Sequence, residues 1–312
     1  MKFYKPKFWD KKKPNLLALI LLPLTILLLA NNLLRNFFKA KKSIDIIKIC
    51  IGNIYVGGTG KTPLAIKSEN ILNAAKLNSV IIKKFYKNQL DEQLLIQKYS
   101  KLICKKKRLD AVKEAKVKNF KYAIFDDGLQ DNSIDYDIKI VCFNNIQWIG
   151  NGFLIPAGPL REKLDSIKKY DAIVINGDPR LNGDLVNEIN KIKKDLQIFE
   201  TMYEISNLEE FDKKLNYVIF SGIGNPKNFL KILKKNNLNI SKEFIFPDHH
   251  NYTDNDLGDI INYSKTNNLK IITTEKDYFK LNEKFQNEML YLKIKIKIFN
   301  EKKFLEFLTH KK

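Results

Sequence analysis

The fold of this chain is decided by the stretch Gly52-Asn53-Ile54-Tyr55-Val56-Gly57-Gly58-Thr59-Gly60-Lys61-Thr62-Pro63. An apolar run at residues 46–51, with the composition of a buried strand, precedes it, and a helical pattern opens at Leu64. A strand, a glycine-rich turn and Gly-Lys-Thr at a helix start form the layout of a phosphate-binding loop. Glycines let backbone N–H groups turn towards a phosphate, and the helix N-terminus adds partial positive charge.

Two side chains of this stretch have the chemistry of nucleotide binding. Lys61 can reach the β- and γ-phosphates, and the Thr62 hydroxyl can hold Mg²⁺. The strict pattern has a glycine where this chain has Tyr55, so we expect the paired glycines after Val56 to supply the flexibility. The alternative is a glycine-rich loop that binds nothing. We predict nucleotide contacts from Val56, Gly57, Gly58, Thr59, Gly60, Lys61, Thr62 and Pro63.

Length and charge restrict the classes of protein. A chain of 312 residues suits two domains, and we expect the boundary near residue 200. The net charge of +20 draws a protein to anionic surfaces, although the lysine excess can also reflect codon composition. Only four of the 55 basic residues are arginine, and no nucleic-acid motif is present, so membrane lipids are favoured over nucleic acid as partners. Three widely spaced cysteines predict reduced thiols and a cytosolic setting.

An apolar segment lies near the N-terminus, from Leu16 to Ala30. Fifteen helical residues span about 22 Å, which is short for a hydrocarbon core about 30 Å thick. Lysines 11–13 precede it, Pro23 interrupts it, and further basic residues follow. A signal peptide is opposed by a poor cleavage site, and a buried core helix stays open. We favour a membrane-embedded or interfacial anchor over residues 1–42.

Strand-like and helical patterns alternate along the rest of the chain, which predicts a parallel sheet with right-handed crossovers. Strands are expected at 46–51, 79–82, 122–125, 138–143, 171–175, 197–205, 217–220 and 269–273, with helices at 64–77, 91–100 and 110–118. The predicted fold is α/β, with a P-loop NTPase-like, mostly parallel sheet covered by helices on both faces. That domain takes residues 43–200, and a smaller α/β domain takes residues 201–312.

Acids and a histidine supply further candidate site residues. Asp126 and Asp127 follow the strand at 122–125, where a Walker B acid holds Mg²⁺; a solvated turn before Gly128 is the alternative. His249 can be tuned by a carboxylate for proton transfer, can ligate a metal, or can belong to a surface turn. Asp91 opens a helix, where acids are common for ordinary reasons.

Taken together, these motifs resemble the tetraacyldisaccharide 4′-kinase family, the lipid A 4′-kinases of Gram-negative envelopes. The matching segments are 52–63, 126–130, 151–162, 222–226, 246–250 and 274–277. They occur in the family's order and cover most of the chain. The resemblance implies transfer of phosphate from ATP, with Mg²⁺, to the 4′-hydroxyl of a tetraacyl glucosamine disaccharide 1-phosphate. It also implies a monomer at the cytosolic face of the inner membrane, in contact with its lipids.

The same resemblance assigns residue roles. Lys61 falls on the phosphate position, and Thr62, Asp126 and Asp127 fall on the metal positions. Asp91 aligns with the catalytic base, and His249 aligns with the histidine that pairs with it. Since the predicted boundary separates these two residues, we expect domain closure over the nucleotide cleft to assemble the dyad.

One stretch departs from the family, and two rival functions follow from the motifs. The family usually has Ser-Arg-Gly-Tyr-Gly after the second strand, where this chain has Lys83-Lys84-Phe85-Tyr86-Lys87. A nucleotide-binding protein descended from the kinase, with weak activity, is therefore one alternative. Another is a membrane-associated P-loop ATPase of the partitioning type, although that class has a lysine at the position of Val56.

Overall fold

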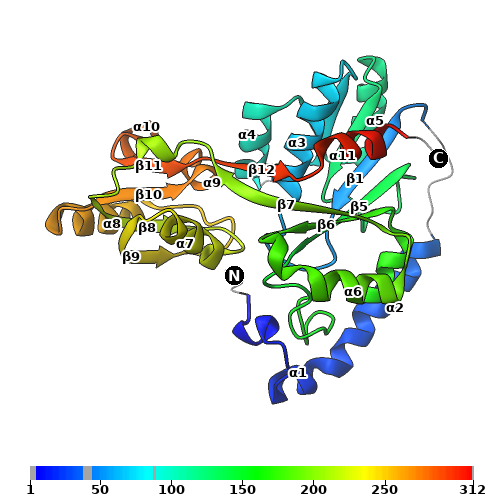
Figure 1. Cartoon of the computed structure of the whole chain (residues 1–312), viewed down its shortest axis with the longest axis horizontal. Coiled ribbons are helices and arrows are strands. Elements are labelled where there is room, and N and C mark those ends of the chain that lie inside the picture. The colour runs from blue at the N-terminus through cyan, green and yellow to red at the C-terminus, as the bar shows by residue number, and fades with distance from the viewer. Residues whose placement is uncertain (1–4, 38–43, 87–88, 311–312) are drawn as a thin grey trace. The chain divides into compact units, whose positions relative to one another are not determined.

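The structure is a computed structural model that describes residues 5–37, 44–86 and 89–310. The chain forms two compact units (Figure 1). The described residues of the larger unit lie within 5–86, 99–203 and 296–310, and those of the smaller unit within 89–98 and 204–295. Two segments therefore differ from the predicted domains of 43–200 and 201–312. Residues 89–98 join the smaller unit, and the C-terminal residues return to the larger one.

The larger unit is built on one eight-stranded sheet in the order β12-β7-β6-β5-β1-β4-β2-β3. Its strands are β1 (Ile47–Gly52), β2 (Ser79–Lys84), β3 (Leu102–Lys105), β4 (Tyr122–Asp126), β5 (Ile138–Asn144), β6 (Ala172–Asn176), β7 (Gln197–Ile205) and β12 (Ile294–Ile298). Every neighbouring pair from β7 to β3 is parallel. The continuous apolar runs are buried on both faces, as parallel sheets require. The predicted α/β fold with a large, mostly parallel sheet is confirmed.

Helices cover both faces of this sheet. The crossover from β1 to β2 contains α3 (Lys61–Ala74). The crossover from β3 to β4 contains α5 (Arg108–Val117), and the crossover from β6 to β7 contains α6 (Gly183–Ile192). Both of these crossovers move along the strand order in the direction opposite to the crossover from β1 to β2. Right-handed crossovers therefore place α3 on one face and α5 and α6 on the other. The C-terminal helix α11 (Glu301–Thr309) contacts α3, and its Phe304 packs on Phe199 of β7 with ring centroids 4.9 Å apart.

The smaller unit has a four-stranded parallel sheet in the order β11-β10-β8-β9. Its strands are β8 (Asn216–Ser221), β9 (Asn239–Ile245), β10 (Lys270–Thr274) and β11 (Met289–Leu292). Its helices are α4 (Leu90–Tyr99), α7 (Pro226–Lys235), α8 (Asp254–Thr266), α9 (Glu275–Tyr278) and α10 (Glu283–Gln286). Residues of α7 and α8 belong to two separate core clusters. Parallel strands end at one edge of a sheet, and this edge carries the residues discussed below.

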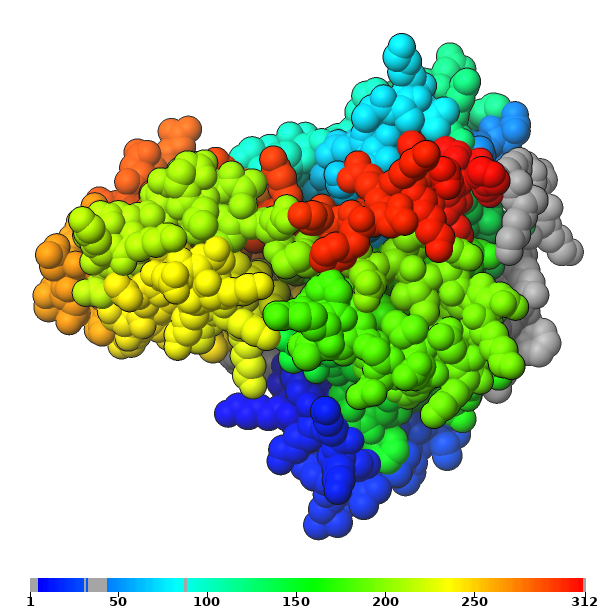
Figure 2. Space-filling view, in the orientation of Figure 1, coloured from blue at the N-terminus to red at the C-terminus, as the bar shows by residue number. Residues whose placement is uncertain are grey.

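The N-terminal segment lies on the larger unit as a broken helix. It consists of η1 (Lys7–Asp10), α1 (Leu16–Leu21), η2 (Leu22–Leu24) and α2 (Thr25–Phe37), and Pro23 lies at the break. Leu28 and Leu29 pack against Tyr55 and its neighbours. Other apolar side chains of the segment point into solvent, and Figure 2 shows the segment at the surface. Within the described ranges, no helix has the length and apolar character needed to cross a membrane.

Candidate active site

The glycine-rich stretch forms a closed turn between β1 and α3. Gly60, the residue before α3, has a φ of +93°, and an added Cβ would lie 3.0 Å from the Tyr203 hydroxyl. A side chain would therefore be strained by the backbone conformation and would crowd Tyr203. The Asn53 amide donates hydrogen bonds to the Gly57 carbonyl, at 3.3 Å, and to the Thr59 hydroxyl, at 3.1 Å. The loop is thus held in shape by the chain itself, with Lys61 and Thr62 in the first turn of α3.

Tyr55 stands where the strict phosphate-loop motif has its first glycine, and it anchors the loop to the residues packed beneath it. Its side chain is fully buried and packs with Leu154 and Leu160. Its hydroxyl donates to the Asp10 carboxylate and accepts from the Lys5 ammonium. Burial, together with the Asp10 carboxylate, raises the pKa of the Tyr55 hydroxyl. This residue is therefore a structural part of the loop, which it ties to the N-terminal segment.

The two predicted metal acids lie beside the loop at the end of β4. The Asp126 side chain is fully buried, and its Oδ2 accepts hydrogen bonds from the Thr62 hydroxyl, at 3.0 Å, and from the Lys83 ammonium, at 2.6 Å. Its Oδ1 is buried and has no hydrogen-bond partner. Asp127 Oδ1 lies 3.8 Å from Lys61 Nζ and 3.1 Å from a guanidinium nitrogen of Arg161. The structure thus brings the predicted phosphate and metal residues of this unit together.

These residues fit Mg²⁺. A buried carboxylate oxygen without a partner is costly, and a cation would satisfy Asp126 Oδ1. Across the described part of the chain, no three or more His, Cys, Asp or Glu side chains form a group that could hold a metal ion. Mg²⁺ beside a nucleotide does not require such a group, because it uses one or two carboxylates, water and phosphate oxygens. The Thr62 hydroxyl and the Asp126 carboxylate match that requirement.

Asp91 is the centre of a second cluster, in the smaller unit. It lies in the first turn of α4, and only 2% of its side chain is exposed. His249 Nδ1 lies 3.0 Å from its Oδ2 and 3.1 Å from its Oδ1. The ammonium groups of Lys276 and Lys280 lie 3.3 Å and 3.2 Å from the same Oδ2. The predicted dyad is therefore present, together with two lysines that the sequence did not assign to the site.

Loops at the carboxyl ends of β8, β9 and β10 build this cluster. The Gly222 N–H donates to Asp277 Oδ2 at 2.9 Å, and the Gly222 carbonyl accepts from the His249 N–H at 3.1 Å. Asp277 Oδ1 in turn accepts from Lys280 at 3.0 Å. His249 has a φ of +58°, which turns its ring towards Asp91. The motifs at 222–226, 246–250 and 274–277 therefore each contribute at least one residue to the cluster around Asp91.

The charges of the cluster keep Asp91 ionised. Burial raises the pKa of the Asp91 carboxyl, but the hydrogen bond from His249 and the lysine charges outweigh burial and hold that pKa below its usual range. An ionised carboxylate only accepts hydrogen bonds, so we assign the proton of the shared bond to His249 Nδ1. Lys276 is also held charged: burial lowers its pKa, and nearby carboxylates, Glu92 first, outweigh burial and raise it.

Domain closure is not needed to form the dyad, and that prediction is wrong. Asp91 and His249 belong to the same compact unit. The reason is that α4 precedes the predicted boundary in sequence but packs in the smaller unit, to which it contributes its buried acid, Asp91. The neighbouring His250 has a separate role, because its Nε2 lies 3.0 Å from Asp256 Oδ2 at the start of α8.

Sequence reasoning did not identify Lys83, although a signal was present. It follows the apolar run Val80, Ile81 and Ile82 within a buried strand, and its side chain is 3% exposed. A charged residue at a buried strand position requires a charged partner, and Asp126 is that partner. Of the predicted residues, Lys61, Thr62, Asp126 and Asp127 lie together in the larger unit, and Asp91 and His249 lie together in the smaller unit.

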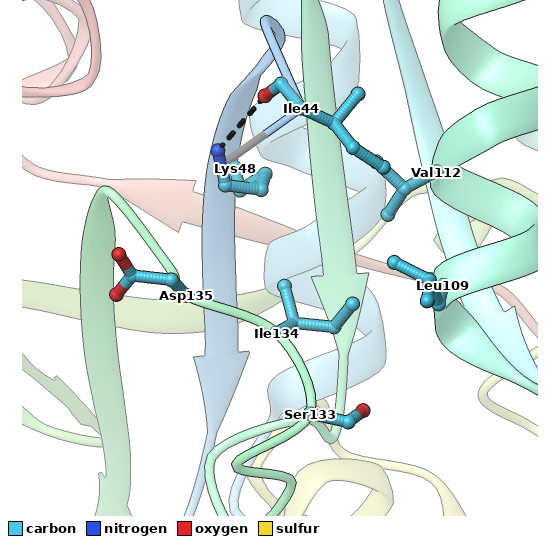
Figure 3. A pocket seen from close by; sticks show the side chains of 7 residues that line it. All are labelled: Ile44, Lys48, Leu109, Val112, Ser133, Ile134 and Asp135. Carbon is cyan, nitrogen blue, oxygen red and sulfur yellow. Dashed lines mark hydrogen bonds between the residues drawn. The ribbon is translucent and has the colours of Figure 1, made fainter. Parts of the chain in front are cut away.

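A small pocket between β1 and α5 has no part in either cluster (Figure 3). Its lining residues are Ile44, Lys48, Leu109, Val112, Ser133, Ile134 and Asp135. The Lys48 ammonium donates to the Ile44 carbonyl at 3.3 Å, which uses one of the few polar groups there. None of the predicted site residues lines this pocket.

Comparisons with known proteins agree with the motifs. The family described as LpxK, tetraacyldisaccharide-1-P 4′-kinase, matches residues 15–312. The tetraacyldisaccharide 4′-kinase of Pelagibacter ubique (strain HTCC1062) is 46% identical over 303 residues, which cover 97% of this chain and 96% of the relative. That of Rickettsia bellii (strain OSU 85-389) is 34% identical, with 96% of each chain covered. A crystal structure of LpxK from Aquifex aeolicus, described as an "apo" form in complex with ATP, has a TM-score of 0.70 at 23% identity, with 94% of this chain and 98% of that chain covered. At 23% identity, this structural similarity shows the fold alone.

Proposed function

This chain belongs to the tetraacyldisaccharide 4′-kinase family, and from that premise we propose how its residues carry out the reaction. The reaction is transfer of the γ-phosphate of ATP to the 4′-hydroxyl of a tetraacyl glucosamine disaccharide 1-phosphate, a step of lipid A biosynthesis. The observation that carries the assignment is the coexistence of a formed phosphate loop and a buried, ionised Asp91 in a chain that matches the family over nearly its whole length. Membership of this family also argues against the alternative function, a partitioning-type ATPase.

The larger unit supplies the nucleotide side. Backbone N–H groups of residues 57–62 and the N-terminus of α3 face the phosphates, and Lys61 moves from Asp127 to the γ-phosphate. Thr62 and Asp126 would hold Mg²⁺, with Asp127 beside them; the ion supplies positive charge for the transferring phosphoryl group. Asp127 keeps the Arg161 guanidinium close to this region.

The smaller unit supplies the acceptor side. Asp91 accepts the proton of the sugar 4′-hydroxyl, and His249 fixes the orientation of the carboxylate. Although the cations make Asp91 a weak base, phosphoryl transfer has a loose transition state in which the hydroxyl proton is lost late. Lys276 and Lys280 also offset the repulsion between a carboxylate and a phosphate. Because the loop and the base belong to different units, we propose that turnover requires the units to bring them together.

The N-terminal segment supplies membrane attachment. Exposed fractions reach 73% for Leu16, 64% for Ile20 and 70% for Leu27, and Lys11, Lys12 and Lys13 are exposed beside them. An apolar surface flanked by lysines suits the acyl boundary of an anionic bilayer. We therefore propose that the protein works as a monomer attached to lipids at the cytoplasmic face of the inner membrane, where its acceptor lipid is found.

A transfer assay tests the function. Purified full-length protein is incubated with ATP, Mg²⁺ and the disaccharide 1-phosphate lipid. Mass spectrometry then identifies the product and the position of the new phosphate on the sugar. We expect the 4′-phosphorylated lipid. The matched control acceptor has its 4′-hydroxyl blocked and should give no product. Absence of product from the free acceptor, with an active family member as positive control, would contradict the proposal.

A further inference from the structure

We propose that the Lys83 ammonium is a resident counter-cation of Asp126, which orients this carboxylate and delays metal binding until a nucleotide is present. The proposal rests on the proposed function, because it concerns the same nucleotide site. Lys83 is a positioning residue in this account. It touches the metal carboxylate and is not assigned any contact with the reacting atoms.

The two side chains meet because their strands are neighbours. β2 and β4 are parallel, with Ile82 paired to Phe125, so the next residues, Lys83 and Asp126, lie side by side at the carboxyl ends of both strands. Lys83 Nζ lies 2.6 Å from Asp126 Oδ2, and the side chains are 3% and 0% exposed. Neither group can exchange its partner for bulk water without leaving its place.

The hydrogen bonds divide the two oxygens of Asp126. Oδ2 accepts from both Lys83 and Thr62, whereas Oδ1 is buried without a partner. Two donors on Oδ2 fix the orientation of the carboxylate, and this leaves Oδ1 available to a ligand of the site. A divalent cation satisfies a lone, buried carboxylate oxygen beside a phosphate loop. Lys83 therefore prepares Asp126 to bind a metal through Oδ1 alone.

The charge of Lys83 has a second effect. It neutralises a fully buried carboxylate, which would otherwise be costly, and it repels a divalent ion that approaches without its own counter-charge. The negative phosphates of a nucleotide remove that penalty. The metal is therefore expected to bind weakly to the protein alone and to bind well together with ATP.

Direct metal binding tests the inference. Mn²⁺, as a paramagnetic probe, is titrated into the nucleotide-free full-length protein, and free Mn²⁺ is measured by electron paramagnetic resonance. Lys83→Met should bind Mn²⁺ at least tenfold more tightly than the wild type. The matched control is Lys84→Met, which removes the same charge from the next position, where the ammonium lies over the Tyr86 ring at 5.4 Å. Unchanged or weaker Mn²⁺ binding by folded Lys83→Met, as judged by circular dichroism, would overturn the proposal.

A second measurement needs no variant, so a folding defect in Lys83→Met cannot obscure the result. Mn²⁺ binding to the wild type is compared with and without a non-hydrolysable ATP analogue, after subtraction of Mn²⁺ bound by the free analogue. We expect at least tenfold tighter binding with the analogue, and equal affinity would contradict the proposal. If that result is negative while the transfer assay yields product, the role of Lys83 fails and the kinase function stands. A protein that binds neither analogue nor Mn²⁺ and gives no product would contradict both.

Discussion

His249 Nδ1 lies 3.0 Å from Asp91 Oδ2, although 158 residues separate the two along the sequence. The contact lies within one compact unit and is reinforced by Lys276 and Lys280 on the same carboxylate. A carboxylate with three cationic or donor groups and 2% exposure is held in one orientation. The acceptor half of the proposed chemistry is therefore complete before any substrate binds.

Asp91→Asn should separate catalysis from nucleotide binding. The substitution keeps the shape of the side chain and removes its ability to take a proton, so kcat should fall by about 10²–10⁴. ATP affinity should change less than about threefold, because the phosphate loop lies in the other unit. Steady-state kinetics and calorimetry with ATP check both values. The control is Glu92→Gln, the half-buried neighbour of Asp91 on α4, which removes another carboxylate near Lys276, at 3.5 Å. An equal loss of kcat in that variant would argue against a specific base.

Asp91 should also make stability depend on pH. Its pKa is lowered in the folded protein from an ordinary value of 3.8, so its contribution to stability is fully present above about pH 4 and is lost as pH falls through the lower folded pKa. Asp91→Asn should therefore reduce the free energy of unfolding at pH 7 by about 2–4 kcal/mol, and by clearly less at pH 3. Urea unfolding at the two pH values measures the difference. A constant difference would show that the charge of Asp91 is not responsible.

Local patterns predicted the parts of the fold that have strong periodicity or motif spacing. The β1 strand, the phosphate loop and Asp126 follow one another within a single parallel sheet, where apolar runs and turn residues are distinct. The edge strand β9 escaped prediction because most of its residues are exposed and it contains no apolar run. The return of β12 and α11 to the larger unit depends on distant contacts, such as Phe304 on Phe199.

The candidate site shows the same division. Lys61, Thr62 and Asp126 were placed by motif spacing, and the structure brings them together. The partners of Asp91 could not be derived from spacing, because three loops from separate strands converge on it. Lys83 could be found only by asking why a lysine occupies a buried strand position.

Tyr55→Gly, which restores the strict glycine pattern of the loop, should damage the protein. Tyr55 is fully buried and its hydroxyl joins Lys5 and Asp10, so the change leaves a cavity and flexible backbone. We expect a loss of about 3–5 kcal/mol in unfolding free energy, against about 1 kcal/mol for the control Tyr55→Phe. Thermal and urea unfolding provide the measurement. A stable Tyr55→Gly protein with tighter ATP binding would mean that the tyrosine is only a poor substitute for glycine.

Membrane attachment should depend on the exposed apolar face of the N-terminal segment. Ile20 and Leu27 are 64% and 70% exposed, and burial of each in a bilayer is worth about 1.5–3 kcal/mol. Ile20→Asn with Leu27→Asn should therefore lower partitioning onto anionic vesicles at least a hundredfold, as measured by co-sedimentation. Leu181→Asn is the matched control, since this leucine is 56% exposed on the same unit but outside the segment. High salt should weaken only the part of binding that comes from the lysines. If the double variant binds vesicles as well as Leu181→Asn does, the segment is not the attachment surface, whatever the rate of phosphate transfer.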